Sequence, residues 1–315
     1  TYEGSGTEGD PYLINGTNEQ MLQELQAINK NASTLQFSYY ALTADIDAST
    51  TSEWNNGAGF IPLGTNNSVL FDRGGFDGKN YTISSLYINE TSEGYAGLLG
   101  YSYASEVRNL KLNSIQITGS NKVGGIAGYF ASNNDDFTLQ NIIVDGNISG
   151  SDASGGIVGE FDDSGEITML RFTGNVSGTH AGGLIGNSES RIDISNSKVV
   201  ADLLAWQTNF GVGGLVGGAR NPVGVSDSYA RVLRMEQTGI GVGGSVHGLV
   251  GSGEGELSDT YTVVDDSNDN LGTTRSASDS NDLDTSEQYD RLEAVSLQNM
   301  TGIAAVDAMD FDWGD

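Results

Sequence analysis

Several residue types are scarce in this chain of 315 residues, and each scarcity removes a class of protein. There is no cysteine, which excludes a disulfide, a thiolate nucleophile and a cysteine metal site. No apolar run reaches the roughly 18 residues that a membrane-spanning helix needs. The chain begins at Thr1 with no basic and apolar leader, so we expect a mature, exported product or a chain trimmed to the same effect.

Positive charge is also scarce. The 42 acidic and 14 basic residues give a net charge of −28, which repels nucleic acid and anionic lipid and excludes both as expected partners. Two interpretations of the acidity stay open. Clustered carboxylates bind calcium, and an acidic surface stays hydrated in strong salt, where its charges are screened. Because the acids are spread over the whole chain, we favour a halophilic protein.

What the chain has in abundance is a glycine motif that recurs at a short period. The first copy, Ala96-Gly97-Leu98-Leu99-Gly100, is followed by five more, of which the last, His247–Gly251, is degenerate. Successive closing glycines are 28, 31, 27, 31 and 34 residues apart. The repeated glycines are Gly97, Gly100, Gly125, Gly128, Gly156, Gly159, Gly183, Gly186, Gly214, Gly217, Gly248 and Gly251. Such a period predicts one small unit stacked many times. We expect the glycines to supply positive φ at turns and room for close backbone approach.

Between the glycine motifs, apolar residues recur at matching positions, as in Val107/Leu110/Leu112 and Leu139/Ile142/Val144. Rungs of 27–34 residues suit about three strands each. We therefore predict an all-β protein, a right-handed parallel β-solenoid (β-helix) of about eight rungs over residues 37–265. Residues 1–36 form a lead-in with a capping helix that opens on a Thr17 to Gln20 capping box. Residues 266–315 contain an acidic loop, a second helix after Thr285 and a strand or tail at Met309–Trp313.

The chain resembles the GLUG-motif repeat family, named for a Gly-Leu-aliphatic-Gly core, over nearly its whole length. The resemblance implies a secreted or surface-exposed parallel β-solenoid. Such repeats serve as spacers or adhesive stalks in larger surface proteins, some bacterial immunoglobulin A proteases among them. The protease part would need a His-Glu-x-x-His helix, and this chain has no such sequence. Besides the glycine motifs, the similar segments are Gly4–Ile14, Glu19–Ile28, Tyr40–Asp47, Phe60–Gly64, Gly75–Ile83 and Met300–Trp313.

The candidate chemical groups indicate no catalytic residue. His180 and His247 are interpreted as turn residues. Neighbouring acids are expected by chance among 42 carboxylates, and the pairs are Asp45/Asp47, Asp135/Asp136 and Asp162/Asp163. We expect no cofactor to be required. Calcium is the one ion left open, because oxygen ligands are concentrated in the stretch that contains Asp265, Asp266 and Asp269.

Eight Asn-x-Ser/Thr sequons are candidate glycosylation sites, of which Asn66 and Asn89 are favoured because they lie in polar turn sequence. Two of them, Asn147 and Asn175, occupy similar places in successive repeats. The full set is Asn15, Asn31, Asn66, Asn80, Asn89, Asn147, Asn175 and Asn299.

Three functions remain in competition. The leading hypothesis is a non-enzymatic extracellular or cell-surface structural protein that acts by self-assembly, as a filament or surface array, or by adhesion. The alternative is a carbohydrate-binding adhesin stalk, with Trp54, Tyr101, Tyr103 and Trp206 as a sugar platform. A polysaccharide-active enzyme is the third. The expected partners are copies of the same chain or surface glycans.

Overall fold

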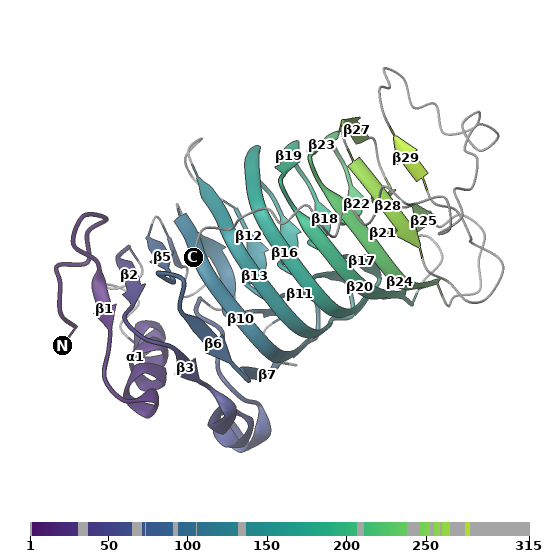
Figure 1. Cartoon of the computed structure of the whole chain (residues 1–315). Coiled ribbons are helices and arrows are strands. Elements are labelled where there is room, and N and C mark those ends of the chain that lie inside the picture. The colour runs from purple at the N-terminus through teal and green to yellow at the C-terminus, as the bar shows by residue number, and fades with distance from the viewer. Residues whose placement is uncertain are drawn as a thin grey trace, which may run out of the picture.

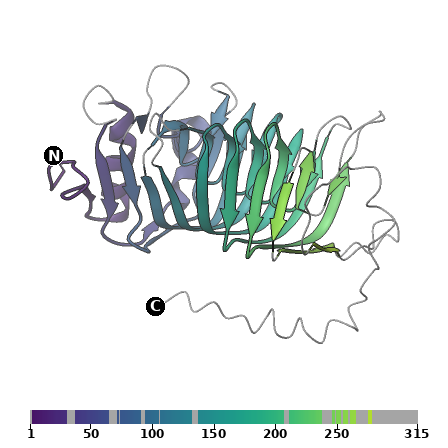
Figure 2. The ribbon, with the colours of Figure 1, turned by 90° about the horizontal axis from the view of Figure 1, so that it is seen from above.

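The computed structural model shows an elongated coil of parallel strands, which runs from the N-terminal end to the C-terminal end of the described chain (Figures 1 and 2). The structure describes residues 2–30, 37–64, 71–72, 74–90, 94–104, 106–131, 137–206, 211–237, 246–247, 249–252, 255–258, 260–264 and 275–277. These residues build about seven turns, and the predicted parallel β-solenoid is confirmed. The expected helix after Thr285 and the strand at Met309–Trp313 lie outside the described residues.

Three sheets line the coil. The long sheet consists of β1 (Tyr12–Ile14), β2 (Tyr39–Leu42), β3 (Ile46–Asp47), β5 (Gly75–Asp77), β6 (Thr82–Ser84), β7 (Tyr87–Glu90), β10 (Glu106–Gly119), β13 (Thr138–Ser149), β16 (Gly165–Gly178), β19 (Ile192–Ser195), β20 (Lys198–Ala205), β23 (Val223–Ser226), β24 (Tyr229–Gln237), β27 (Gly255–Ser258), β28 (Thr260–Val264) and β29 (Arg275–Ala277). The first short sheet consists of β8 (Tyr95–Ala96), β11 (Lys122–Gly124), β14 (Ala153–Gly155), β17 (His180–Gly182), β21 (Val212–Gly213) and β25 (Val246–His247). The second short sheet consists of β4 (Phe71–Asp72), β9 (Leu99–Tyr103), β12 (Ala127–Phe130), β15 (Val158–Phe161), β18 (Ile185–Ser188), β22 (Val216–Ala219) and β26 (Val250–Ser252).

The N-terminal end of the coil is capped. Helix α1 (Asn18–Lys30) begins at the predicted capping box, where the Thr17 amide donates to Gln20 Oε1 at 2.8 Å. Its apolar side is buried in the core through residues such as Leu22 and Leu25. The edge of β1 is covered in turn, because the Leu13 amide donates to the Glu3 carbonyl at 2.9 Å. A short 3-10 helix, η1 (Ser49–Gly57), which the sequence reading did not predict, follows β3.

The stacking columns read from the sequence are confirmed in register. Val107 of β10 pairs with Leu139 of β13, and Leu139 pairs with Ile167 of β16, all three buried. Burying such rows stabilises the coil by about 25 cal/mol per Å² of apolar surface. Where the column turns polar, Ser197 stays buried and its hydroxyl accepts a hydrogen bond from the Leu170 amide at 3.1 Å. The serine therefore replaces the apolar contact of the earlier rungs by a hydrogen bond to the backbone of the preceding rung.

The motif glycines are explained by close approach and not by φ. None of those in the described residues lies in the left-handed region. Instead, a Cβ on Gly159 would lie 2.5 Å from the Val123 nitrogen and 2.6 Å from the Gly128 oxygen. The two short sheets therefore touch backbone to backbone, and only glycine leaves the room. Positive φ as the reason for these glycines was wrong. Gly248 lies outside the described residues.

Positive φ falls instead on a corner of the long sheet, where the chain turns once per rung. Asn109, Asn141 and Asn196 occupy it with φ of 52°, 54° and 49°. Asparagine tolerates this conformation because its short amide bonds locally. The amide of Asn141 donates to Asn109 Oδ1 at 2.8 Å, so the corner side chains form a ladder. Met169 interrupts this ladder with a φ of 56°.

Candidate functional site

The outer face of the two short sheets carries a concentration of tyrosines. Tyr101 of β9 and Tyr129 of β12 pair in register, and their rings stack with centroids 4.5 Å apart and planes 6° apart. Tyr95 packs edge-on against both rings, and the hydroxyls of Tyr101 and Tyr103 lie 3.1 Å apart. We call these four residues the tyrosine face. Strand alternation explains it, because the neighbouring Phe130 points into the core.

Lys122 links the tyrosine face to the next rungs. Its ammonium lies 5.6 Å from the Tyr129 ring centroid and 5.9 Å from that of Tyr95, within the range of a cation–π contact. It also forms a close ion pair with Glu160 of β15. Both side chains are mostly buried, so this pair positions the ammonium against the rings.

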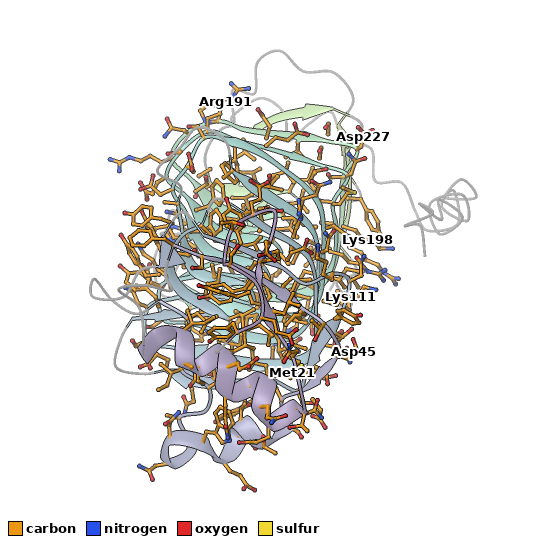
Figure 3. All side chains as sticks on the ribbon, turned by 90° about the vertical axis from the view of Figure 1, so that its left-hand side faces the viewer. Met21, Asp45, Lys111, Arg191, Lys198 and Asp227 are labelled. Carbon is orange, nitrogen blue, oxygen red and sulfur yellow. The ribbon has the colours of Figure 1, made fainter. Side chains whose placement is uncertain are left out.

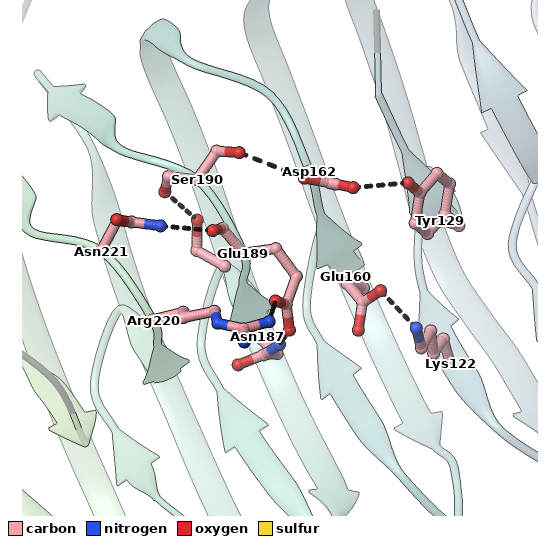
Figure 4. Close-up of polar contacts among 10 residues, drawn as sticks. Lys122, Tyr129, Glu160, Asp162, Asn187, Glu189, Ser190, Arg220 and Asn221 are labelled. Atoms are coloured by element: carbon pink, nitrogen blue, oxygen red, sulfur yellow. Dashed lines mark hydrogen bonds and ion pairs between the residues drawn. The ribbon is translucent and has the colours of Figure 1, made fainter.

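Beyond Glu160, a polar ladder continues across β15, β18 and β22 (Figure 4). Asp162 accepts a hydrogen bond from the Tyr129 hydroxyl at 2.9 Å and one from the Ser190 hydroxyl at 3.1 Å. Glu189 accepts from the Asn187 amide at 2.8 Å and forms an ion pair with Arg220 at 3.0 Å. The face thus combines aromatic rings with planar amide, carboxylate and guanidinium groups.

Burial shifts the pKa of several groups on these sheets. Burial, aided by hydrogen bonds and nearby charge, raises the pKa of Tyr101 and Tyr129, so both phenols stay protonated and able to donate. Burial lowers the pKa of His180, which keeps its imidazole neutral near pH 7. In the part of the chain that the structure describes, no group of three or more His, Asp or Glu side chains is placed to hold a metal ion.

A second polar cluster lies on the long sheet. Arg108 forms ion pairs with Asp77, at 3.0 Å, and with Glu106. Burial would raise the pKa of Asp77, but hydrogen bonds from Lys79, Asn109 and Arg108 outweigh it and lower that pKa. Burial raises the pKa of Glu106 despite the arginine. Because β5 and β10 are neighbours, the cluster ties the first rungs together.

The carboxylate pairs named from the sequence have local roles where they are described. Asp45 accepts the Thr82 amide at 2.7 Å, and Asp47 accepts the Ser49 amide at 3.0 Å. Asp45 therefore links two neighbouring rungs, whereas Asp47 holds a local turn. Asp162 belongs to the polar ladder. Asp135 and Asp136 lie outside the described residues, as do the calcium candidates Asp265, Asp266 and Asp269.

The interpretation of the two histidines as turn residues was wrong, because both lie on strands of the first short sheet. His180 lies on β17 and His247 on β25, with β21 between them. The four aromatic residues predicted to form a sugar platform do not all lie together. Tyr101 and Tyr103 lie together, whereas Trp54 packs against the core and Trp206, 39% exposed, follows β20.

Two of the sequons meet in space. Asn147 of β13 pairs in register with Asn175 of β16, and the Asn175 amide donates to Asn147 Oδ1 at 2.5 Å. Both asparagines are exposed, and the sequon hydroxyls of Ser149 and Ser177 are 3.0 Å apart. Asn15, Asn80 and Asn89 are described and are not fully buried, while Asn31, Asn66 and Asn299 lie outside the described residues.

Tyr95, Lys122 and Tyr129 are not among the residues predicted from the sequence, although a signal for one of them existed. The residue after each closing glycine falls in one outward column, which reads Tyr101, Tyr129, Glu160 and Asn187. Aligning the repeats on their closing glycine would have exposed this column. That this column lies against Tyr95 and Lys122 depends on how the two short sheets pack, which the sequence does not show.

No family model matches the chain. It is 39% identical over 165 residues to a halomucin of Haloquadratum walsbyi and 32% identical over 216 residues to an immunoglobulin A1 protease of Streptococcus sanguinis. These matches cover 50% and 65% of this chain but only 2% and 11% of the two relatives, so the chain spans a small part of each.

Two solved structures share the fold. A candidate immunoglobulin A1 protease from Bacteroides ovatus superposes with a TM-score of 0.63 at 21% identity, over 89% of this chain and 83% of that one. A structure named IgA1 protease superposes with a TM-score of 0.53 at 25% identity, over 79% of this chain and 19% of that one. In the described residues, no helix is long and apolar enough to cross a membrane.

Proposed function

We propose that the chain is a stalk-like module of an extracellular or cell-surface protein and that it acts by adhesion through its long outer faces. The tyrosine face and its polar ladder carry the proposal. Aromatic rings with adjacent amide and carboxylate groups are the usual means of holding a hydroxyl-rich ligand such as a glycan. The glycan-binding adhesin thus becomes the preferred form of the adhesion hypothesis.

The capped N-terminal end supports a lateral contact over a filament built at that end. Helix α1 and the Glu3 segment cover the edge that another subunit would pair with. Self-assembly then takes place side by side, as a surface array. The C-terminal residues that would form the other end lie outside the described part of the chain.

The similar proteins support an extracellular or cell-surface location. One similar protein is named halomucin, and a net charge of −28 suits a protein that works in strong salt. Three of the similar proteins are named as immunoglobulin A1 proteases, one of them as a candidate. Because this sequence contains no His-Glu-x-x-His, our proposal assigns it no proteolytic step.

A glycan array tests the adhesive role. We expect the chain to bind a subset of glycans, and the signal to fall at least tenfold for Tyr103→Ala. Tyr87→Ala, a half-buried tyrosine on the long sheet, is the matched control and keeps the signal. An array without hits, or equal losses for the two variants, contradicts the proposal. Light scattering at several salt concentrations tests side-by-side assembly in parallel, and a strictly monomeric chain refutes that part.

A further inference from the structure

A row of positive charge crosses the long sheet of this acidic protein. Lys111 of β10, Arg171 of β16 and Lys198 of β20 occupy one register column, with Ile143 of β13 between the first two. We call these three cations the basic column. Figure 3, which looks along the shaft, places Lys111 and Lys198 on the same side of the molecule.

The basic column is unusual because its cations have no acidic partner in the described residues. The chain carries three acids for every base, 42 against 14, and Arg108, Lys122, Arg191 and Arg220 all form ion pairs. Lys111, Arg171 and Lys198 form none with the acidic side chains that the structure describes. In a protein so rich in carboxylates, three aligned cations without an acidic partner among the described residues indicate a surface that binds an external anion.

The surroundings favour a saccharide over other anions. Next along the column stands Tyr229 of β24, and the Lys198 ammonium lies 4.8 Å from its ring centroid. On the same sheet, the exposed amides of Asn147 and Asn175 stand farther along β13 and β16. A ring and amides beside cations match the ring faces, hydroxyls and acid groups of a uronic or sulfated sugar.

Spacing points to a polymer. Strands in a sheet are ~4.8 Å apart, so Arg171 and Lys198 are about that far apart at their Cα atoms and Lys111 lies roughly twice as far from Arg171. The charges of an extended acidic polysaccharide recur at comparable intervals. Three cations also suit a polymer with widely spaced charges. A nucleic acid, which is more densely charged, would be repelled more strongly by the net charge of −28 on the protein.

We propose that the basic column binds an anionic polysaccharide, with each cation contacting one carboxylate or sulfate group along the chain. Asp145 and Asp202, which stand farther along β13 and β20, limit the positive strip on one side and orient the polymer along the shaft. This site is separate from the tyrosine face, which lies on the short sheets, and it stands or fails independently of that face.

Titration calorimetry with hexagalacturonate tests the proposal, using the full chain made in a host without N-glycosylation. The variant is Arg171→Gln with Lys198→Gln. The control, Arg191→Gln with Lys79→Gln, also removes one arginine and one lysine charge, and it leaves the basic column, the tyrosine face and the polar ladder intact. We expect about tenfold weaker binding for the variant, from two lost exposed contacts, and unchanged binding for the control. The methyl ester of hexagalacturonate, which lacks the charges, should not bind.

Three results overturn the proposal. They are equal affinity of the variant and the control, equal binding of the acid and its methyl ester, and tighter binding of a single-stranded DNA hexamer than of hexagalacturonate. Lys111→Gln serves as an independent single variant, expected to weaken binding about threefold. Each variant is compared with the wild-type chain by its thermal midpoint, so that a fold defect is distinguished from a lost contact.

Discussion

Met169→Asn is expected to stabilise the protein, because Met169 lies in a corner of the coil that neighbouring rungs fill with asparagine or aspartate. Met169 has a φ of 56°, and the positions one rung before and after it are Asn141 and Asn196. A left-handed conformation costs an ordinary side chain roughly 1–2 kcal/mol, and asparagine bears much less of that cost. The new amide also reaches the ladder in which Asn141 already donates to Asn109.

The expected gain follows from three opposing contributions. Relief of backbone strain contributes about 1 kcal/mol, and one more net hydrogen bond about 0.5–1 kcal/mol. Against these stands the loss of a partly exposed methionine contact, roughly 0.5–1 kcal/mol. The free energy of unfolding should therefore rise by about 1 kcal/mol, equivalent to ~2 °C in the thermal midpoint of a chain of this size.

Urea unfolding measures this gain, provided that the slope of the transition is unchanged. Met169→Leu is the control, since it keeps an apolar side chain and relieves no strain, so it should bring no gain. The reverse exchange, Asn141→Met, introduces strain and breaks the ladder, and should cost about 1–2 kcal/mol. If Met169→Asn is no more stable than Met169→Leu and Asn141→Met is harmless, the account of the corner is wrong.

Three further predictions concern other parts of the coil. Gly159→Ala should lower the free energy of unfolding in urea by about 3 kcal/mol or more, because its Cβ would lie 2.5 Å from a backbone nitrogen. Gly9→Ala, whose Cβ would have no atom within 4 Å, should change it little. Equal effects would exclude close approach as the reason for the motif. Burial lowers the pKa of His180 below its ordinary 6.5, so the unfolded chain binds the proton first, and the free energy of unfolding should fall as pH drops below about 6.5. His180→Gln should remove part of that decrease, and an identical pH profile would refute the assignment. Lys122→Met and Glu160→Gln should each lower the free energy of unfolding by about 2 kcal/mol, because each leaves the other, mostly buried charge without its partner. The double variant should lose much less than the sum of the two. Strictly additive losses would show that the pair is not coupled.

Much of the coil could be predicted because its determinants are local and periodic. The spacing of the closing glycines predicted stacked rungs, and matching apolar positions such as Leu110 and Ile142 predicted columns that now pair in register. Capping groups around Thr17 predicted helix α1 to within a residue or two. Each of these signals lies within one repeat, or in one repeat and the next.

The tertiary structure decided what depends on how the sheets meet. Only the fold shows that Gly159 is required by the backbone of the neighbouring sheet, and that positive φ falls instead on corner residues such as Asn109 and Asn141. The tyrosine face joins Tyr95 to Tyr129, 34 positions along the sequence, by the angle between the two short sheets. The basic column arises because Lys111 and Arg171, two rungs apart, project from one sheet face. The sequence by itself determined the repeat length and therefore the elongated coil, because each repeat stacks only on its two neighbours. Which side chains share a surface depends on where the chain turns within each rung, and the sequence of a single repeat does not show this.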